Sequence, residues 1–119
     1  MTKEEIIDKK LYELSKSDFR RSFKLKEKDI LYVKDKGINV IREHAYTFIN
    51  DMLKGYMIVN DGRQTSMRGH PVFIGQHATG TCCRGCLNKW HGIDKNRELT
   101  RNEINYVVEL IIIWIERQL

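Results

Sequence analysis

The fold is decided by the stretch TRNEINYVVELIIIWI, residues 100–115. Thr100 and Glu103 form a capping box, which predicts that a helix begins here. Apolar residues then recur at the three- and four-residue spacing of one helical face. These residues are Ile104, Val107, Val108, Ile111, Ile112 and Ile115. We expect this helix to be the central packing element, with Ile113 either buried in the same way or placed at a homo-oligomer contact.

Other helices are predicted from caps and apolar spacing. Thr2 and Glu5 form a second capping box, which opens an N-terminal amphipathic helix. A short helix is predicted over residues 28–36, and Gly37 is its stop because glycine accepts positive φ. Apolar positions from 38 to 53 follow helical spacing closely and predict a longer helix.

A short helical turn is predicted after Ser17, which is a suitable N-cap. Phe19 and Phe23 are four residues apart and therefore share a face, so we expect both rings to pack in the core. Arg20 and Arg21 lie between them and are expected to point toward solvent.

The segment before Pro71 differs in character. Asn60-Asp61-Gly62 is a turn signal, and residues 56–59 before it are either a short strand or an ordered loop. We therefore predict a mainly α fold, a compact single-domain helical bundle over residues 1–119, with a long ordered loop or small hairpin near residues 55–70.

The composition is that of an ordinary globular protein, with 41% hydrophobic residues and a net charge of +5. The N-terminus is charged, and the most apolar run, residues 107–115, is too short to cross a bilayer. We expect a bacterial cytoplasmic protein that makes no membrane contact. Its three cysteines fall within five positions, which indicates reduced thiols, a metal site or a redox pair instead of a disulfide framework.

All three cysteines and three of the four histidines lie between residues 70 and 91; the fourth, His44, receives no role. Thr81 as N-cap and Gly92 as stop predict a helix from about Cys82 to His91. On that helix Cys83 and Cys86 share a face with Leu87 and Trp90. One interpretation is therefore a thiol-rich core with no ligand.

A metal site is the competing interpretation, because Cys83-x-x-Cys86 is the usual spacing for two thiolates on one zinc ion. The predicted ligands are Cys83, Cys86, His77 and His91, with Cys82 and His70 in reserve. One difficulty is that His91 lies about 140° from Cys86 around a regular helix. An iron–sulfur cluster is less favoured with three cysteines.

A thiol-dependent enzyme of unknown reaction is an alternative. A helix N-terminus and Arg84 would lower the pKa of one thiol. Loop residues Asp61, Gln64 and Arg68 would join Arg84, His70, His77 and a cysteine if the loop folds over the site. The βαβ context of a disulfide oxidoreductase is missing.

A basic nucleic-acid-associated module is the second alternative, although no reader motif is present. The basic residues that suggest it are Arg20, Arg21, Arg63, Arg68, Arg84 and Lys89. Binding through phosphates would weaken steeply with salt.

The pattern H-A-T-x-T-C-C-R-x-C-L-x-K-W-H-x-I occupies residues 77–93. With Asn-Asp-Gly-x-Gln-Thr at 60–65, it resembles a small bacterial family known only as a domain of unknown function, over nearly the whole chain. The resemblance implies no reaction, cofactor or catalytic residue, but it favours a site over packing alone. The sequence departs from the family at Gly75 and Gly80, where alanine is expected, and at Ser66, where proline is expected.

Overall fold

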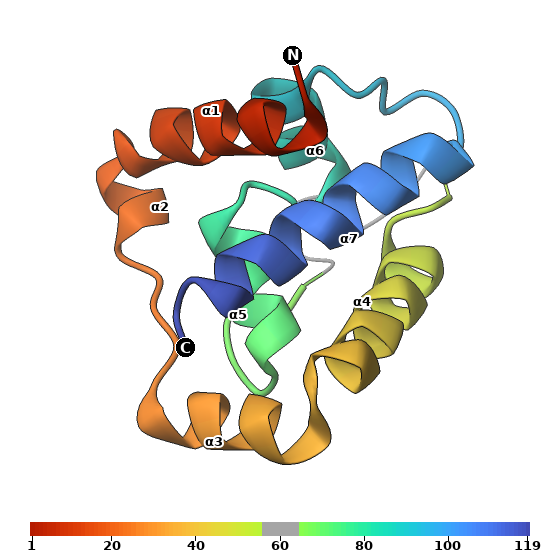
Figure 1. The fold of residues 1–119 in the computed structure, drawn as a ribbon. Coiled ribbons are helices and arrows are strands. Elements are labelled where there is room, and N and C mark those ends of the chain that lie inside the picture. The colour runs from red at the N-terminus through yellow and green to blue at the C-terminus, as the bar shows by residue number, and fades with distance from the viewer. Residues whose placement is uncertain (56–64) are drawn as a thin grey trace.

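The structure is a computed structural model that describes residues 1–55 and 65–119. These residues form helices joined by turns, without a strand, so the predicted mainly α fold is confirmed (Figure 1). No helix in them has the length and apolarity that a membrane crossing requires. The predicted short strand and the Asn60-Asp61-Gly62 turn lie outside the described residues. The helices are α1 Lys3–Ser15, α2 Asp18–Arg21, α3 Glu27–Lys36, α4 Ile38–Met52, α5 Pro71–Ala78, α6 Arg84–His91 and α7 Arg101–Glu116.

Helix α7 is the central element, as predicted. Its capping box is formed: the Glu103 N–H donates to Thr100 Oγ1 at 3.1 Å, and the Thr100 N–H donates to Glu103 Oε1 at 2.8 Å. Helix α7 crosses the middle of the molecule and packs on α4 and α5 (Figure 1). Each fully buried isoleucine on its inner face stabilises the fold by about 1.5–3 kcal/mol. Its buried residues are Ile104, Val107, Val108, Leu110, Ile111, Ile112 and Ile115.

The predicted helices before residue 55 are also confirmed. Thr2 caps α1 by accepting from the Glu5 N–H, and Ser17 caps the one-turn helix α2. Helices α3 and α4 meet at Gly37, whose φ of +88° suits glycine.

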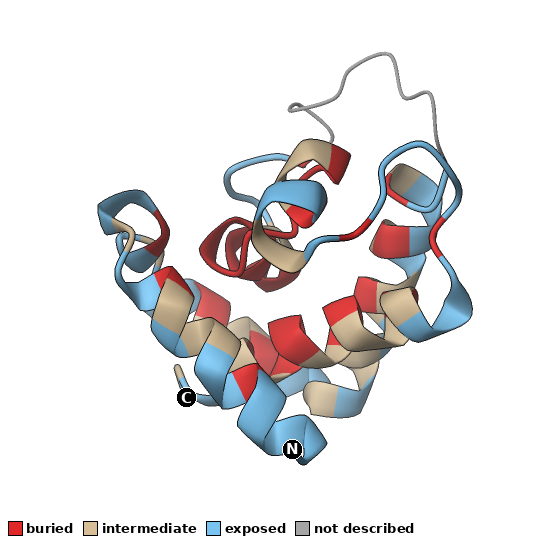
Figure 2. Ribbon diagram, turned by 90° about the horizontal axis from the view of Figure 1, so that it is seen from above, coloured by how far each residue is buried: buried red, intermediate tan, exposed pale blue. Residues whose placement is uncertain are grey.

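Helix α5 was not predicted. It begins at Pro71, whose missing N–H costs nothing in the first turn, and His70 is its N-cap. The Nδ1 atom of His70 accepts a hydrogen bond from the Val72 N–H at 3.0 Å. Most of α5 and the turn after it are buried, and this buried stretch lies in the middle of the molecule (Figure 2).

Helix α6 begins later than predicted. Thr81 is buried in the turn and bonded to Gln76, so it does not cap the helix. Cys83 is the N-cap instead, and its Sγ accepts from the Cys86 N–H at 3.3 Å. The predicted stop is confirmed, because Gly92 has the left-handed conformation.

Replacing Gly80 by alanine is expected to destabilise the fold more than replacing Gly92. Their φ angles are +68° and +66°, so the backbone strain is about the same, roughly 1 kcal/mol. A Cβ at Gly80 would lie 2.8 Å from Trp90 Cδ1, whereas one at Gly92 would meet nothing within 4 Å. Urea unfolding should show an extra loss of about 1–3 kcal/mol for Gly80→Ala. Equal losses would contradict the tight packing of Trp90.

Candidate functional site

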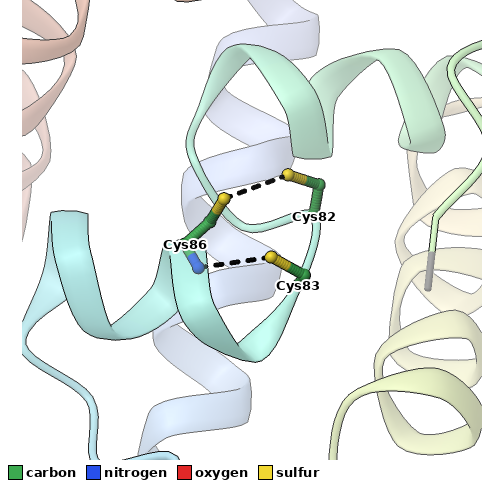
Figure 3. A group of neighbouring side chains, drawn as sticks. All are labelled: Cys82, Cys83 and Cys86. Atoms are coloured by element: carbon green, nitrogen blue, oxygen red, sulfur yellow. Dashed lines mark hydrogen bonds between the residues drawn. The ribbon is translucent and has the colours of Figure 1, made fainter. Parts of the chain in front are cut away.

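Three cysteine sulfurs converge on one place. The Sγ atoms of Cys82, Cys83 and Cys86 all lie within 4.8 Å of one another. Cys82 and Cys83 come from the turn between α5 and α6, and Cys86 from the first turn of α6 (Figure 3). The Sγ atoms of Cys82 and Cys86 are 3.6 Å apart, and none of the three cysteines forms a disulfide.

A buried polar network holds the turn that carries the cysteines. Gln76 Nε2 donates to the Thr81 carbonyl oxygen at 3.2 Å, and the Thr81 N–H donates to the Gln76 carbonyl oxygen at 2.8 Å. Thr65 Oγ1 donates to the Cys82 carbonyl oxygen at 2.8 Å. Because buried polar groups are costly when unpaired, these bonds fix the turn and with it the direction of the sulfurs.

Arg20 of α2 contacts two of the three sulfurs. Its guanidinium donates to Cys86 Sγ at 3.2 Å, to Cys82 Sγ at 3.6 Å and to the His77 carbonyl oxygen at 2.8 Å. The residue is only 9% exposed. Within residues 1–55 and 65–119 no salt bridge joins it to a carboxylate, and the groups that raise its pKa are the sulfurs of Cys82 and Cys86.

The prediction that Arg20 points to solvent is therefore wrong. Helix α2 is one turn long and packs on α5, so its inward face carries the arginine. Of the two phenylalanines expected in the core, Phe19 is 53% exposed, while Phe23 is partly buried and stacks on His77 at 5.4 Å between ring centroids.

The sulfurs differ in acidity. The pKa of Cys82 is lowered to about 7, chiefly because Cys86 donates a hydrogen bond to it; burial opposes this, and Arg20 reinforces it. The pKa of Cys86 is raised, first by that same hydrogen bond and then by burial. Burial alone would lower the pKa of Arg20, but its hydrogen bonds to both sulfurs raise it. The group therefore favours an anionic sulfur beside a cationic guanidinium.

The structure does not bring the predicted histidine ligands into the sulfur group. Among the described residues, the group of ligand atoms that lie within 4.8 Å of one another consists of the three cysteine sulfurs. It does not include a nitrogen of His70, His77 or His91. His77 Nε2 lies 3.2 Å from the carbonyl oxygens of both Thr65 and Ser66, so it acts as a donor to them. Burial lowers the pKa of His77.

The other two histidines are also held by neighbours. His91 Nε2 lies 2.8 Å from the Thr79 carbonyl oxygen, and its Nδ1 lies 2.8 Å from Tyr106 Oη. His70 Nε2 lies 3.0 Å from Nδ1 of His44, a partner that the sequence did not suggest. Each of these ring nitrogens therefore has a neighbour within hydrogen-bond distance.

Arg84 binds the backbone of several other segments. It is buried, and its guanidinium ties the start of α6 to the end of α4 and to the segment before α7. It donates to the backbone carbonyl oxygens of Leu53, Lys54, Gly55, Asp94 and Arg97. The arginine that donates to the sulfurs is Arg20.

The remaining predicted site residues are Asp61, Gln64 and Arg68. Asp61 and Gln64 lie outside the described residues, and Arg68 is exposed. Of the basic residues that suggested nucleic-acid binding, Arg20 and Arg84 point inward, so they are not available to phosphates.

The sequence comparison extends over the whole site. A family model described as Domain of unknown function (DUF4186) matches residues 8–116. The chain belongs to the DUF4186 family. The matched range contains Arg20 and all three cysteines of the DUF4186 chain. No solved structure matches it.

The pH dependence of thiol alkylation should reveal the Arg20–sulfur contact. In metal-free protein, the rate at which Cys82 reacts with iodoacetamide should increase with pH, with a midpoint near pH 7, because the thiolate is the reacting form. Arg20→Met should move the midpoint upward, whereas Arg21→Met, at an exposed neighbour, should not. Peptide mass spectrometry gives the rates. A midpoint near the ordinary value of 9.0 in the unmodified protein would contradict the contact.

Acid should destabilise the fold through its buried histidines. Burial lowers the pKa of His70 and of His91 to about 4, from an ordinary value of 6.5. The unfolded chain therefore binds protons first, and the free energy of unfolding should fall as the pH drops from 6.5 to 4. The His70→Asn variant keeps an N-cap acceptor. In urea titrations its free energy of unfolding should fall less steeply between pH 6.5 and pH 4. An unchanged slope would show that His70 does not titrate in this range.

Proposed function

We propose that this DUF4186 protein binds one transition-metal ion, zinc, through the thiolates of Cys82, Cys83 and Cys86. The observation that carries the proposal is the convergence of three sulfurs within 4.8 Å. Thiolates are preferred ligands of zinc, and three reduced cysteines at one point are not explained by packing alone.

The sulfur spacing fits a tetrahedral ion. Zinc–sulfur bonds of about 2.3 Å in a tetrahedron separate two sulfurs by roughly 3.8 Å. The Sγ atoms of Cys82 and Cys86 are 3.6 Å apart, so these two need little movement to share an ion. Cys83 lies in the same group and is fixed by the N–H of Cys86, a contact that also stabilises a thiolate.

The charges around the site support the same proposal. Three thiolates and one divalent ion carry a net charge of −1, which a single guanidinium compensates. Arg20 supplies that guanidinium from a buried position and donates to two of the three sulfurs. The N-terminus of α6 adds a partial positive charge beside Cys83.

The described residues supply three ligands, one fewer than a closed structural zinc site has. The fourth place would then be taken by a water molecule, a substrate atom or a ligand from outside those residues. Cys86 is only partly buried, which leaves this side of the site nearer to solvent than Cys82 and Cys83. Three protein ligands with one exchangeable position are the arrangement of catalytic zinc sites.

A thiol-dependent reaction is the second candidate, and the contact of Arg20 with Cys82 favours it. A thiol with a pKa near 7 is substantially ionised at neutral pH and is therefore a better nucleophile than an ordinary cysteine. The two candidates differ in what purified protein contains: bound metal in the first case and metal-free, alkylatable thiols in the second.

Protein purified without a histidine tag from zinc-supplemented cells should contain close to one zinc per chain. Single replacements of Cys82, Cys83 or Cys86 by serine should each weaken zinc binding by about 100-fold or more in competition with a chromophoric chelator. His91→Gln should retain the metal, because its nitrogens face Thr79 and Tyr106. Metal-free preparations that also fail to bind zinc in titration would refute the proposal.

A further inference from the structure

Three clefts lie in a row along the segment that joins α2 to α3 and along the start of α3. The first, of about 260 Å³, and the second, of about 300 Å³, share Phe23 and Lys24 in their linings. The second and the third, of about 270 Å³, share Lys28, Asp29 and Gly69. In Figure 1 the segment between α2 and α3 runs down one side of the molecule. We call these three clefts together the side groove.

The lining of the side groove is strongly basic. The chain as a whole has 21 Lys and Arg against 16 Asp and Glu. Among the described residues that line the groove, Asp29 is the one carboxylate; it is buried and accepts from the Lys26 N–H at 3.1 Å. The cationic residues of the lining are Arg20, Arg21, Lys24, Lys26, Lys28, Arg68 and Arg117. The excess of positive charge is therefore far larger in the groove than in the whole chain.

All of these cations except Arg20, which donates to the sulfurs, can contact an anion from outside. Arg21 pairs with Asp18 at the surface. Arg117 pairs with Asp8, and because exposed ion pairs contribute little, both arginines can exchange these partners for a ligand phosphate. The exposed groove residues that form no salt bridge within residues 1–55 and 65–119 are Lys24, Lys26, Lys28 and Arg68.

An aromatic side chain lines each of the three clefts. Trp114 lines the first, Phe23 the first and the second, and Tyr32 the third. All three are partly buried, and the ring of Phe23 is supported by that of His77, with 5.4 Å between the ring centroids. A basic groove with aromatic rings along it is the arrangement that binds single-stranded nucleic acid, because cations contact the phosphates and the bases stack on the rings. In a duplex the bases are paired and stacked on one another, so they could not enter the clefts.

We propose that the side groove binds a single-stranded nucleic acid. The phosphates lie along Lys24, Lys26 and Lys28, and the bases enter the clefts beside the aromatic rings. The inference does not depend on the proposed metal, because Arg20, the residue of the lining that donates to the sulfurs, takes no part in it.

The salt dependence of binding tests the phosphate contacts. Fluorescence anisotropy gives the affinity for labelled single strands of about 12 nucleotides, oligo-dT and oligo-U. In about 50 mM salt, the triple variant with alanine at Lys24, Lys26 and Lys28 should bind at least about tenfold more weakly than wild type. Its slope of log K against log salt concentration should be smaller by about 2, since each phosphate contact on a single strand contributes about 0.7. The matched control replaces three exposed lysines outside the groove by alanine, and it should keep the wild-type slope: Lys3, Lys9 and Lys95.

A second variant tests the contact with the bases. Tyr32→Leu removes an aromatic ring from the third cleft without changing the charge, so binding should weaken by about fivefold or more while the salt slope stays the same. Tyr12→Leu is its control, because Tyr12 is 63% exposed on α1 and lies outside the groove. Thermal unfolding of each variant shows that the fold is retained.

Three results would overturn the proposal. The first is no binding of either oligonucleotide by wild type at low salt. The second is an equal loss of affinity in the groove triple variant and in its lysine control, which would show that net charge alone attracts the strand. The third is a duplex of the same length that binds as tightly as the single strands, with Tyr32→Leu indistinguishable from wild type, which would make the groove a general polyanion surface. Tighter binding of one of the two oligonucleotides, with the expected variant effects, supports the proposal and identifies the partner as DNA or RNA.

Discussion

The site depends on the contact between the Arg20 guanidinium and the sulfurs of Cys82 and Cys86. A cation that is 9% exposed and has no carboxylate beside it among the described residues needs an anion, and the acceptors within reach are sulfur and one carbonyl oxygen. This requirement makes thiolate the expected state of the cluster. The four-residue helix α2 carries this guanidinium, and its acceptors lie on α5, on the turn after α5 and on α6.

The packing of α5, α6 and α7 determines where the three cysteines lie relative to the Arg20 guanidinium. Helix α7 provides the apolar surface on which α5 lies, and a Cβ at Gly75 would sit 3.1 Å from Ile111 Cγ2, so this approach is close. Gln76 and Thr81 then hold the turn after α5, and Arg84 ties the start of α6 to the end of α4. Three cysteines that fall within five positions thereby point to one centre instead of spreading around a helix.

Much of the fold could be predicted from sequence because its signals are local. The N-cap at Thr2, the capping box at Thr100, the apolar spacing of α4 and α7 and the stop at Gly92 are all confirmed. The predictions that failed depend on distant partners or unusual chemistry. Helix α5 starts from a histidine cap, α6 from a sulfur cap, and neither belongs to the common N-cap residues.

The site was predicted in part. Cys83 and Cys86 are in the cluster, and Cys82, held in reserve, joins them as a full member. Arg20 could not have been found from spacing, because its partners lie 57 to 66 residues away and periodicity over one helical turn does not fix which side is buried. The roles of Asp61 and Gln64 stay predictions.

X-ray absorption at the zinc edge of the loaded protein tests most directly whether three sulfurs share one ion. The account predicts three sulfur neighbours at about 2.3 Å and one light-atom neighbour, without the outer-shell scattering of imidazole. A first shell of two sulfurs and two imidazole nitrogens would contradict it, because His77 or His91 would then have to leave the contacts that hold them in the fold.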